Sequence, residues 1–537
     1  MRKRPFVLVI LDGWGLAPPH KGNAIDLANT PNFDKLWSVY PHTQLLASGE
    51  AVGLPKGEDG NSETGHLNLG AGKIVFQDLP RINNCISDGS FFEIEAFKKV
   101  IKHIKENNSN LHLMGLIGFG GVHSNLEHLF ALLRLAKNEG LKNVYLHLFT
   151  DGRDSPPHSA MLHISNIQEE IEKIGIGKIA TLCGRYFAMD RNHRWERTQK
   201  AYELITQGKG KTGISIKEAL KETYNREKTD EFLEPLLLEK EGLVKNNDGV
   251  IFFNFRIDRP RQLTKAFVLK DFEKLKLTKV SFDPYAEKYG LKQYQTPSTE
   301  KPFTRKIILK NLCFVTMTEY EKGLPTEIAF PPRIVKMPLS RVLAEKEIRQ
   351  LHLAETEKER FITYYFNGQR EKPFPGEDKI EIPSPKVATY DQKPEMSAYE
   401  ITDTLLERLK LGLYDFFVVN FANPDMVGHT GVLKAGIKAC EVVDECLGKL
   451  IRTILNLDGI CFIVADHGNT EEMLSLIDGK VDTKHSVNPV PFIIVGKQFA
   501  QNYHALKKGV LADVAPTILS VMGINKPQLM TGNNLLS

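Results

Sequence analysis

Short apolar runs alternate along this chain with longer amphipathic stretches. The runs are rich in Val, Ile, Leu and Phe, as in buried strands, whereas the stretches repeat apolar residues at helical spacing. We expect strands at residues 6–11, 111–118, 144–150, 178–183, 250–255, 415–420, 460–465 and 490–495, and helices at 93–107, 126–138, 160–174, 194–207, 397–411 and 433–456. The alternation predicts an α/β fold class, with mostly parallel sheets flanked by helices.

The chain has 537 residues, too many for a single hydrophobic core, so at least two domains are expected. Clusters of glycine and proline at residues 69–73 and 323–332 suggest boundaries. The prediction is a discontinuous domain of residues 1–76 and 330–537, with residues 77–329 inserted as a second domain. Residues 285–304 predict a loop or a small insertion, and residues 211–241 are charged and helical in character.

Composition narrows the classes of partner. The formal net charge is only +4, so nothing favours nucleic acid or an anionic membrane as a partner. The six cysteines form no CxxC pair, as expected for buried thiols in a reducing compartment. The apolar stretch near the start is too short for a signal peptide, and no window approaches the roughly 20 apolar residues that span a bilayer. We therefore expect a cytoplasmic protein that works as a monomer.

Metal-ligating residue types follow several of the predicted strands. The carboxyl ends of parallel strands meet at one edge of a sheet, where ligands bind. A further histidine, in TKHSVNP, comes from a loop just before another strand. The residues that this edge would bring together are Asp12, Asp425, His429, Asp466, His467 and His485.

These residue types suit a mixed nitrogen and oxygen metal site. Carboxylate oxygen suits Mg and Mn, imidazole suits Mn and Zn, and no thiolate is offered. Asp425 and His429 are four residues apart, so one helical turn would direct both the same way. Taken singly, each fragment is more simply a helix cap or a turn. Together at strand ends, they indicate two divalent metal ions that drive phosphoryl transfer.

Ser62, in KGEDGNSETGHLNLGAG, is the candidate nucleophile. Gly60 and Gly65 flank it, so the backbone can turn tightly and approach a ligand. A serine hydroxyl needs a base or a metal to become nucleophilic, and this sequence has no GxSxG elbow, which leaves metal activation. The alternative is that Ser62 caps a helix that begins near Glu63, and the two roles are compatible.

The middle of the chain places arginines near strand ends. Arginine forks bind carboxylate and phosphate in a bidentate manner, so the set suggests a small substrate that carries both groups. Asp154 is the acid/base candidate, although it could instead cap a helix after DSPP. Taken singly, each arginine could belong to a solvated basic rim, and we assign Arg261 to that role. The candidate residues are His123, Arg153, Asp154, Arg185, Arg191, Arg256 and Arg259.

The motifs together resemble one family, the 2,3-bisphosphoglycerate-independent phosphoglycerate mutases. The resemblance runs from about Pro5 to the C-terminus, and its ADHGN element is shared with the wider alkaline phosphatase superfamily. It rests on LDGWG, DGNSETGHLNLGAG, HLMGLIGFGGVHS, TDGRDSPP, GRYFAMDR, FFNFRIDR, AETEK, SPKVATYDQKPEMSA, NPDMVGHTG and ADHGNTE. Two departures are a longer segment between Arg261 and Phe314, and Ile257 where the family commonly has proline.

The resemblance implies an alkaline-phosphatase-like domain with an inserted α/β transferase domain. It also implies two manganese ions, one held by Asp425, His429 and His485, the other by Asp12, Ser62, Asp466 and His467. The substrate-binding residues that it implies are His123, Arg153, Asp154, Arg185, Arg191, Arg256, Arg259 and Lys358. Lys358 is indicated by the resemblance alone, since by itself it would be a surface lysine on a charged helix.

The implied reaction interconverts 3-phosphoglycerate and 2-phosphoglycerate through a phosphoserine at Ser62, without 2,3-bisphosphoglycerate. Asp154 would act as acid and base, Lys358 would bind phosphoryl oxygens, and the domains would close to exclude water. One alternative is a metal-dependent phosphatase or another phosphomutase of the same superfamily. A non-catalytic protein that binds metal or phosphate is a second alternative, and it would not need Ser62.

Overall fold

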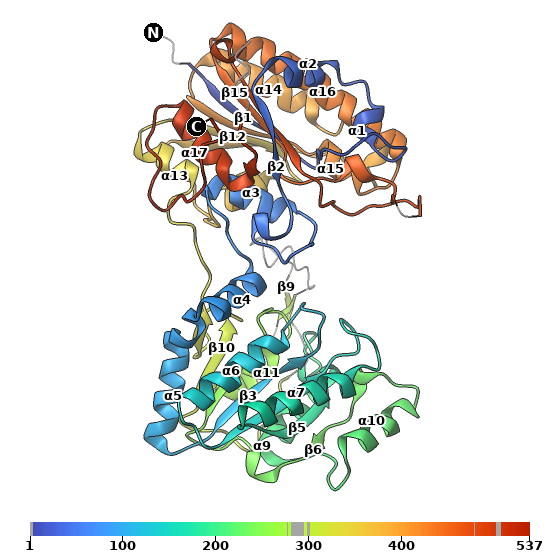
Figure 1. Ribbon diagram of the computed structural model, residues 1–537, viewed down its shortest axis with the longest axis vertical. Coiled ribbons are helices and arrows are strands. Elements are labelled where there is room, and N and C mark those ends of the chain that lie inside the picture. The colour runs from blue at the N-terminus through green and yellow to red at the C-terminus, as the bar shows by residue number, and fades with distance from the viewer. Residues whose placement is uncertain are drawn as a thin grey trace. The chain divides into compact units, whose positions relative to one another are not determined.

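Two compact units make up the chain (Figure 1). Unit 1 consists of Met1–Gln77 and Arg333–Ser537, and unit 2 of Asp78–Pro332. The computed structural model describes residues 4–275, 278–280, 295–297, 301–476, 478–500 and 506–536. The loop predicted at residues 285–304 lies mostly outside the described residues.

Unit 1 is built on an eight-stranded sheet in the order β13-β12-β14-β1-β15-β16-β2-β17. The strands from β13 to β15 are parallel, and β16 is antiparallel to both of its neighbours. Central strands are buried on both faces, which explains their continuous apolar runs. The bounds are β1 Phe6–Leu11, β2 His42–Leu46, β12 Gln350–Glu355, β13 Glu377–Ile382, β14 Phe416–Phe421, β15 Ile460–Val464, β16 Val490–Val495 and β17 Gly509–Val510.

Helices cover both faces of this sheet. Figure 1 shows α2, α14 and α16 along one side, and α3, α13 and α17 along the other. The short helices α1 and α15 pack against α16. The bounds are α1 Ala24–Leu27, α2 Pro31–Val39, α3 Ser62–Ala71, α13 Leu339–Glu345, α14 Ala398–Leu411, α15 Asn423–Gly428, α16 Leu433–Asn456 and α17 Val514–Val521.

Unit 2 contains a seven-stranded sheet in the order β11-β10-β7-β3-β4-β5-β6, parallel except for the edge strand β6. Its strands are β3 Leu111–Ile117, β4 Val144–Thr150, β5 Lys178–Gly184, β6 Leu236–Leu237, β7 Gly249–Phe252, β10 Cys313–Thr318 and β11 Glu327–Phe330. Two separate apolar clusters form, one on each face of the sheet.

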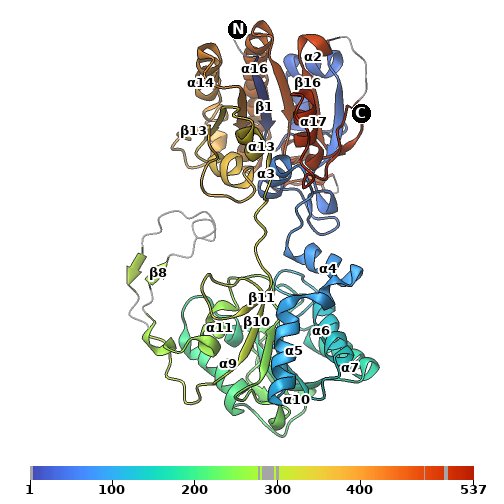
Figure 2. The same ribbon diagram turned by 90° about the vertical axis from the view of Figure 1, so that its left-hand side faces the viewer.

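Figure 2 shows α5, α6 and α7 on one side of the unit 2 sheet and α9 and α11 on the other. These helices are α5 Glu95–Asn107, α6 Leu126–Asn138, α7 Ala160–Ile174, α9 Trp195–Gln207 and α11 Arg261–Val268. Smaller elements complete the unit: α4 Asp78–Asp88, α8 Arg185–Ala188, α10 Ile216–Tyr224, β8 Thr278–Val280 and β9 Gln295–Pro297.

The predicted α/β class with two mostly parallel, helix-flanked sheets is confirmed. Each predicted strand and helix is present, with shifts at some ends. The strand predicted at residues 250–255 ends at Phe252, because the N–H of Phe255 donates to the His123 carbonyl (2.8 Å) instead of continuing the ladder. Residues 211–241 form the α-helix Ile216–Tyr224 and short 3₁₀ turns that begin at Asp230 and Lys240, while Leu236–Leu237 forms the strand β6.

A buried chain of polar side chains crosses the unit 2 sheet. Asp248 Oδ2 lies 3.0 Å from His112 Nε2, and His112 Nδ1 lies 3.0 Å from His147 Nε2. His147 Nδ1 in turn lies 2.8 Å from Thr181 Oγ1. Burial lowers the pKa of both histidines, which favours neutral rings. With both rings neutral the chain has one direction, because a carboxylate only accepts: Thr181 donates to His147, His147 to His112, and His112 to Asp248, and each ring carries its proton on Nε2.

This chain predicts that unit 2 loses stability in mild acid. Burial lowers the pKa of His112 and, more strongly, of His147, while their unfolded pKa is about 6.5. Below that pH the unfolded chain binds protons that the native unit resists, so stability falls as pH falls, by about 1.4 kcal/mol per pH unit for each histidine. Thermal unfolding between pH 7.5 and 4.5 measures the slope.

His147→Gln should make that decline shallower, because glutamine can bridge Thr181 and His112 without titrating. His103→Gln, which changes a partly exposed histidine of the same unit, should leave the slope as it is. An unchanged slope in His147→Gln would contradict the assignment.

Candidate active site

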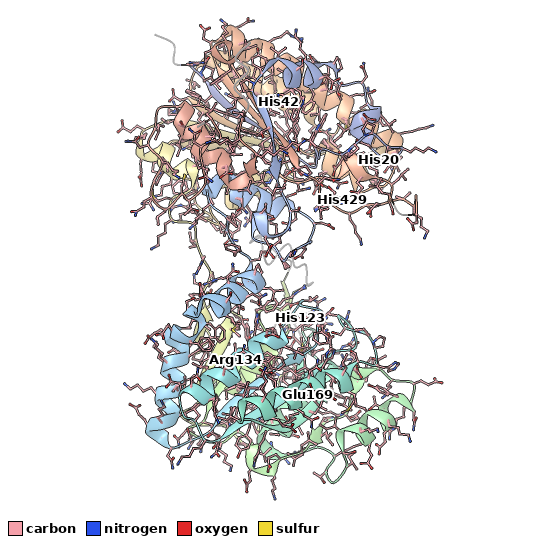
Figure 3. The ribbon with its side chains drawn as sticks, viewed as in Figure 1. His20, His42, His123, Arg134, Glu169 and His429 are labelled. Atoms are coloured by element: carbon pink, nitrogen blue, oxygen red, sulfur yellow. The ribbon has the colours of Figure 1, made fainter. Side chains whose placement is uncertain are left out.

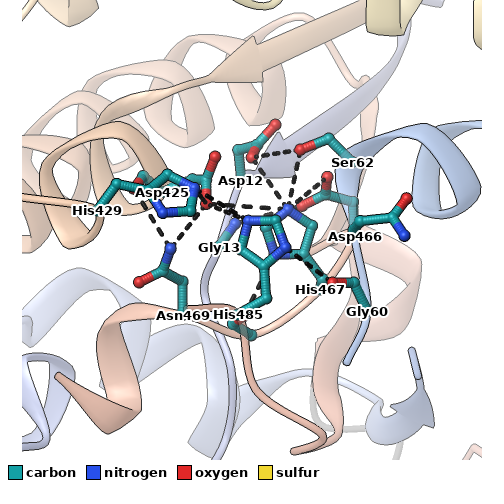
Figure 4. A network of polar contacts seen from close by, with 12 residues as sticks. Asp12, Gly13, Gly60, Ser62, Asp425, His429, Asp466, His467, Asn469 and His485 are labelled. Carbon is teal, nitrogen blue, oxygen red and sulfur yellow. Dashed lines mark hydrogen bonds and ion pairs between the residues drawn. The ribbon is translucent and has the colours of Figure 1, made fainter. Parts of the chain in front are cut away.

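The carboxyl ends of three neighbouring strands of unit 1 bring the metal-type residues together (Figure 4). Asp12 follows β1, Asp425 lies in α15 just after β14, and Asp466 and His467 follow β15. His429 caps the C-terminal end of α15, one turn after Asp425, as the spacing predicted. Gly13 permits this approach, since its φ is 75° and a Cβ there would lie 2.7 Å from Asp425 Cα.

Three histidines of this edge point an unprotonated nitrogen into the site. His429 Nδ1 lies 2.8 Å from the Thr483 carbonyl, and His485 Nδ1 lies 2.8 Å from the Gly60 carbonyl. His467 Nδ1 likewise faces the Gly468 carbonyl, at 3.2 Å. A carbonyl can only accept, so Nδ1 carries the proton in each neutral ring and Nε2 presents a lone pair. Carbonyls commonly orient metal-ligating histidines in this way.

In the neutral rings these lone pairs point toward one another. His429 Nε2 lies 3.0 Å from His485 Nε2, and each lies 3.2 Å from Asp425 Oδ1. Three electron-pair donors this close together repel one another unless a cation lies among them. A proton can take that part: burial lowers the pKa of His429, but Asp425 more than offsets this, and the net shift is upward. The donor set therefore fits a divalent metal.

The buried charges of the site are unbalanced. Asp12, Asp425 and Asp466 are fully buried carboxylates, and Lys358 Nζ lies 2.6 Å from both Asp12 Oδ1 and Asp425 Oδ2. Burial and the neighbouring Asp466 raise the pKa of Asp12 to about 6. Burial alone would lower the pKa of Lys358, but the carboxylates raise it. One ammonium cannot compensate three carboxylates in a dry interior, so the site favours additional cations.

Ser62 lies at the centre of this arrangement. Its Oγ is 2.9 Å from His467 Nε2, 2.9 Å from Lys358 Nζ and 3.4 Å from Asp12 Oδ1. Ser62 is the first residue of α3, but the cap is Asn61, whose Oδ1 accepts from the Thr64 N–H (3.0 Å). The hydroxyl is therefore not engaged in capping, and it lies where the helix N-terminus favours negative charge.

His66 belongs to this site and was missed in the sequence. Its Nδ1 lies 2.9 Å from the Ser62 carbonyl and 3.1 Å from Asp466 Oδ2, while its Nε2 faces Asn420 Nδ2 at 3.0 Å. Ligand atoms converge in two groups, Asp425 with His467 and His485, and Asp12 with His66 and Asp466. The grouping expected from the family placed His429 in the first set and His467 in the second. His467 Nε2 faces both sets, lying 3.6 Å from Asp12 Oδ1 and 3.9 Å from Asp425 Oδ1.

In unit 2, the predicted substrate-binding residues gather around a second polar cluster. Arg185 is buried, and its Nη1 lies 2.5 Å from both Asp151 Oδ1 and Asp154 Oδ2. Burial would raise the pKa of Asp154, but the hydrogen bond and charge of Arg185 lower it overall. Asp154 caps no helix: the cap of α7 is Ser159, and Asp230 Oδ2 accepts from the N–H of Ser159 (2.7 Å).

Asp258 connects the remaining substrate candidates and was also missed. Its carboxylate lies 2.7 Å from Arg191 Nη1, 3.2 Å from Arg256 Nε and 3.8 Å from His123 Nδ1. Burial and Arg185 lower the pKa of His123 to about 4, so this ring is neutral. The position of Asp258 between two candidate arginines, in RIDR, was a signal that could have identified it.

A polar cavity of about 120 Å³ opens beside this cluster in unit 2. Burial and the neighbouring Arg185 and Arg191 lower the pKa of Arg259 to about 10, as expected where cations crowd and no anion is bound. Figure 3 labels His123 among the side chains of unit 2 and His429 among those of unit 1. The cavity is lined by Arg153, Arg185, Tyr186, Met189, Asp190, Arg191, Asn192, Arg197, Glu231 and Arg259.

Comparisons with known proteins decide the family. The Metalloenzyme superfamily matches residues 4–526. A 2,3-bisphosphoglycerate-independent phosphoglycerate mutase from Moorella thermoacetica is 49% identical, over 99% of this chain and 98% of that protein. A protein of the same name from Clostridium botulinum is also 49% identical, over 100% of both chains. The chain belongs to the 2,3-bisphosphoglycerate-independent phosphoglycerate mutases.

A solved structure agrees with this membership. Phosphoglycerate mutase from Leishmania mexicana, whose crystals were studied at low cobalt concentration, matches with a TM-score of 0.57 and 28% identity. The match covers 99% of this chain and 97% of that one. As a mutase of this family, the protein is an isomerase and a metalloenzyme. Within the described ranges, no helix is long and apolar enough to cross a bilayer.

The charge imbalance predicts how the mutase responds to loss of Lys358. Lys358→Met removes the one ammonium among three buried carboxylates, so the metal-free protein should lose about 3–5 kcal/mol of stability. Added Mn²⁺ should raise the thermal midpoint more in this variant than in the wild type, because cations replace the missing charge. Calorimetry with and without Mn²⁺ measures both effects.

Lys379→Met is the matched control, since Lys379 pairs with Glu359 at the surface (2.7 Å). It should respond to Mn²⁺ as the wild type does. An equal response in all three proteins would contradict the charge argument.

Proposed function

We propose that the protein interconverts 3-phosphoglycerate and 2-phosphoglycerate by passing the phosphoryl group through Ser62. The observation that carries the proposal is the buried Ser62 hydroxyl, which lies within 2.9 Å of both His467 Nε2 and Lys358 Nζ at the start of α3. A nucleophile supplied by the chain makes 2,3-bisphosphoglycerate unnecessary as a phosphoryl donor. Membership in the family supports the substrate pair.

We assign two divalent cations to the edge of unit 1, and Mn²⁺ is the metal we expect. Asp425, His429 and His485 would hold one, and Asp12, Ser62, Asp466 and His467 the other. Mixed carboxylate and imidazole ligands without thiolate support this choice. When bound, the cations would lower the pKa of the Ser62 hydroxyl and neutralise charge on the transferring phosphoryl group.

In the first step, a bond forms between Ser62 Oγ and phosphorus as the bond from phosphorus to the glycerate oxygen breaks. Lys358 Nζ donates to Ser62 Oγ and stabilises negative charge on that oxygen. The N-terminus of α3 acts in the same direction. In the return step, the other glycerate oxygen attacks phosphoserine, and the Ser62 oxygen leaves.

The arginines of unit 2 would retain glycerate between the two steps. We assign Arg153, Arg185 and Arg191 to its carboxylate, and Arg256, Arg259 and Lys358 to phosphoryl oxygens. The carboxylates of Asp151, Asp154 and Asp258 now occupy Arg185 and Arg191. An incoming substrate anion would take over these partners, so the binding groups are oriented before the substrate arrives. The proposal requires both clusters to act on one substrate molecule.

Asp154 would carry the protons of the glycerate hydroxyls. It takes up a proton from solvent as the substrate binds, gives that proton to the oxygen that leaves in the first step and takes one from the hydroxyl that attacks in the second. Ser62 begins and ends this cycle as the deprotonated oxygen, so the protons balance. Arg185 now holds this carboxyl ionised, since their hydrogen bond lowers its pKa. When the substrate carboxylate engages Arg185, that hold weakens, and the pKa of Asp154 rises toward the range of an acid/base catalyst. His123, whose Nε2 lies 3.6 Å from Asp154, would position it.

A phosphatase or another phosphomutase of the superfamily is not favoured, because relatives that are 49% identical over nearly the whole chain are named phosphoglycerate mutases. The remaining expectations are a cytoplasmic monomer that binds only its small-molecule substrate. Free cysteines, most of them buried, support a reducing compartment. Sedimentation and cell fractionation test these two points.

Ser62→Ala should abolish mutase turnover because the nucleophile is lost, while phosphoglycerate binding persists because the arginines of unit 2 are unchanged. A coupled assay without 2,3-bisphosphoglycerate measures turnover, and phosphate analysis of the wild-type reaction distinguishes a mutase from a phosphatase. Ser38→Ala, on the surface of unit 1, is the control. Residual turnover in Ser62→Ala would sink the nucleophile assignment, and stoichiometric release of inorganic phosphate by the wild type would favour the phosphatase.

Asp154→Asn should lower kcat by about 10²–10⁴-fold with a smaller change in KM, as expected for loss of an acid/base group. Asp151→Asn is the matched comparison, since Asp151 binds the same Arg185 nitrogen at the same distance. It should mainly raise KM, through poorer orientation of Arg185. Equal kcat values for Asp154→Asn and the wild type would remove Asp154 from proton transfer.

A further inference from the structure

Glu471 is a buried carboxylate whose role the proposed chemistry leaves open. It lies in the short helical turn Thr470–Glu472 of unit 1, and its side chain is fully buried. Among the ion pairs of the described residues, none gives Glu471 a positive partner. Burying an anion without a cation is unfavourable unless hydrogen bonds satisfy it. The identity of its donors therefore indicates what it does.

Four donors fill the acceptor sites of this carboxylate. Oε2 accepts from the backbone N–H of Gly15 (3.1 Å) and of Asn469 (2.8 Å). Oε1 accepts from the hydroxyl of Ser486 and from Asn488 Nδ2 (3.0 Å). An ionised carboxylate offers about four lone-pair sites, so this one is saturated. Charge-assisted hydrogen bonds of this kind are the stronger class in proteins.

The donors come from three segments: the loop after β1, the turn that carries Glu471 itself, and the loop before β16. Gly15 lies three residues after Asp12, Asn469 two residues after His467, and Ser486 directly after His485. Each segment thus carries a residue of the proposed metal site one to three positions before its hydrogen bond to Glu471. Figure 4 shows Asn469 and His485 on these loops beside the site.

Two glycines show how tightly the loops close on Glu471. A Cβ on Gly15 would lie 2.2 Å from Glu471 Cδ, and a Cβ on Gly468 would lie 2.3 Å from Glu471 Oε1. Side chains at these positions would push the carboxylate away. The last glycine of LDGWG and the glycine of ADHGN are therefore both required by the close approach of Glu471.

Further contacts extend the connection to the rest of the site. Asn469, held by Glu471, donates from Nδ2 to Asp425 Oδ1 (2.9 Å). Ser486 accepts at its carbonyl from the N–H of Gly60 (3.3 Å), at the start of the Ser62 segment. The Glu471 carbonyl faces His20 Nε2 at 2.9 Å, and His20 is labelled in Figure 3.

We propose that Glu471 is a positioning residue that sets the spacing of the metal ligands by tying together the loops of Asp12, His467 and His485. The inference rests on the metal assignment made under the proposed function. Glu471 touches none of those ligand atoms, so it acts through the loops. Loss of this tie lets the three loops separate and weakens cation binding more than it weakens the fold.

The test is Mn²⁺ binding by full-length Glu471→Gln, measured from the electron paramagnetic resonance signal of the free ion. Glutamine keeps the shape but turns one acceptor oxygen into a donor, so the four donors no longer all find an acceptor. Loss of such supporting contacts typically weakens metal affinity by about 10–100-fold, and we expect a loss in this range. The thermal midpoint of the metal-free protein should also fall, because buried donors lose an acceptor, so Mn²⁺ affinity is measured at a temperature where the variant is folded.

Glu472→Gln is the matched control, because the neighbouring carboxylate of Glu472 reaches Asn488 alone among these donors (3.1 Å). Its Mn²⁺ affinity should stay within about twofold of the wild type, below the 10-fold threshold for supporting contacts. Should Glu471→Gln fail to fold, Ser486→Ala removes a single donor and should weaken Mn²⁺ binding in the same direction.

The outcomes separate the two claims. Wild-type protein that binds no Mn²⁺ would overturn the metal assignment itself. Wild-type protein that binds Mn²⁺ while folded Glu471→Gln binds it equally well would overturn only the role of Glu471. A lower thermal midpoint of Glu471→Gln with unchanged Mn²⁺ affinity would make Glu471 a purely structural residue and would also contradict the proposal. If Glu471→Gln does not fold, unchanged Mn²⁺ affinity in Ser486→Ala would contradict it.

Discussion

The structure of unit 1 depends on bringing three carboxylates together in a dry interior. Asp12, Asp425 and Asp466 follow neighbouring strands, and parallel pairing forces their side chains to one edge of the sheet. Such a cluster of negative charges is unstable by itself, and neighbouring groups compensate it. Lys358 lies between two of the carboxylates, and the N-terminus of α3 faces them. Backbone carbonyls also turn three imidazole lone pairs inward. The same imbalance that would destabilise a closed core makes this edge a site for cations and for a phosphoryl group.

Unit 2 gathers positive charge instead, with several arginines close together. Here the carboxylates of Asp151, Asp154 and Asp258 act as internal anions that hold Arg185 and Arg191 in place. Under the proposed function, substrate anions would replace these existing partners instead of pairing with solvated side chains. Affinity would then depend on an exchange of partners.

The sequence predicted most of the central strands and the long helices because these have continuous apolar runs or clear helical spacing. It missed the edge strand β13 and the strand β2 next to the other edge, whose alternating or polar residues leave no such run, and it also missed the interior strands β10 and β12. Residues that end strands, such as Asp12 and Asp466, could be predicted because topology alone gathers them. His66 and Glu471 could not, since their partners lie up to 456 positions away and only the folded chain brings them together. Asp258 did leave a signal, because it stands between two candidate arginines in RIDR. The acceptor-only nature of a carbonyl or carboxylate then determines the proton positions, which no motif records.

The most direct test of the central claim is anomalous diffraction from crystals of the metal-loaded protein grown with Mn²⁺. The account predicts two anomalous peaks at the strand-end edge of unit 1, one bonded to Asp425, His429 and His485, the other to Asp12, Asp466 and His467. A peak bonded to His66 in place of His467 would keep the site but change the division between ions. Absence of Mn²⁺ from this edge, with Lys358 still paired to both carboxylates, would contradict the claim.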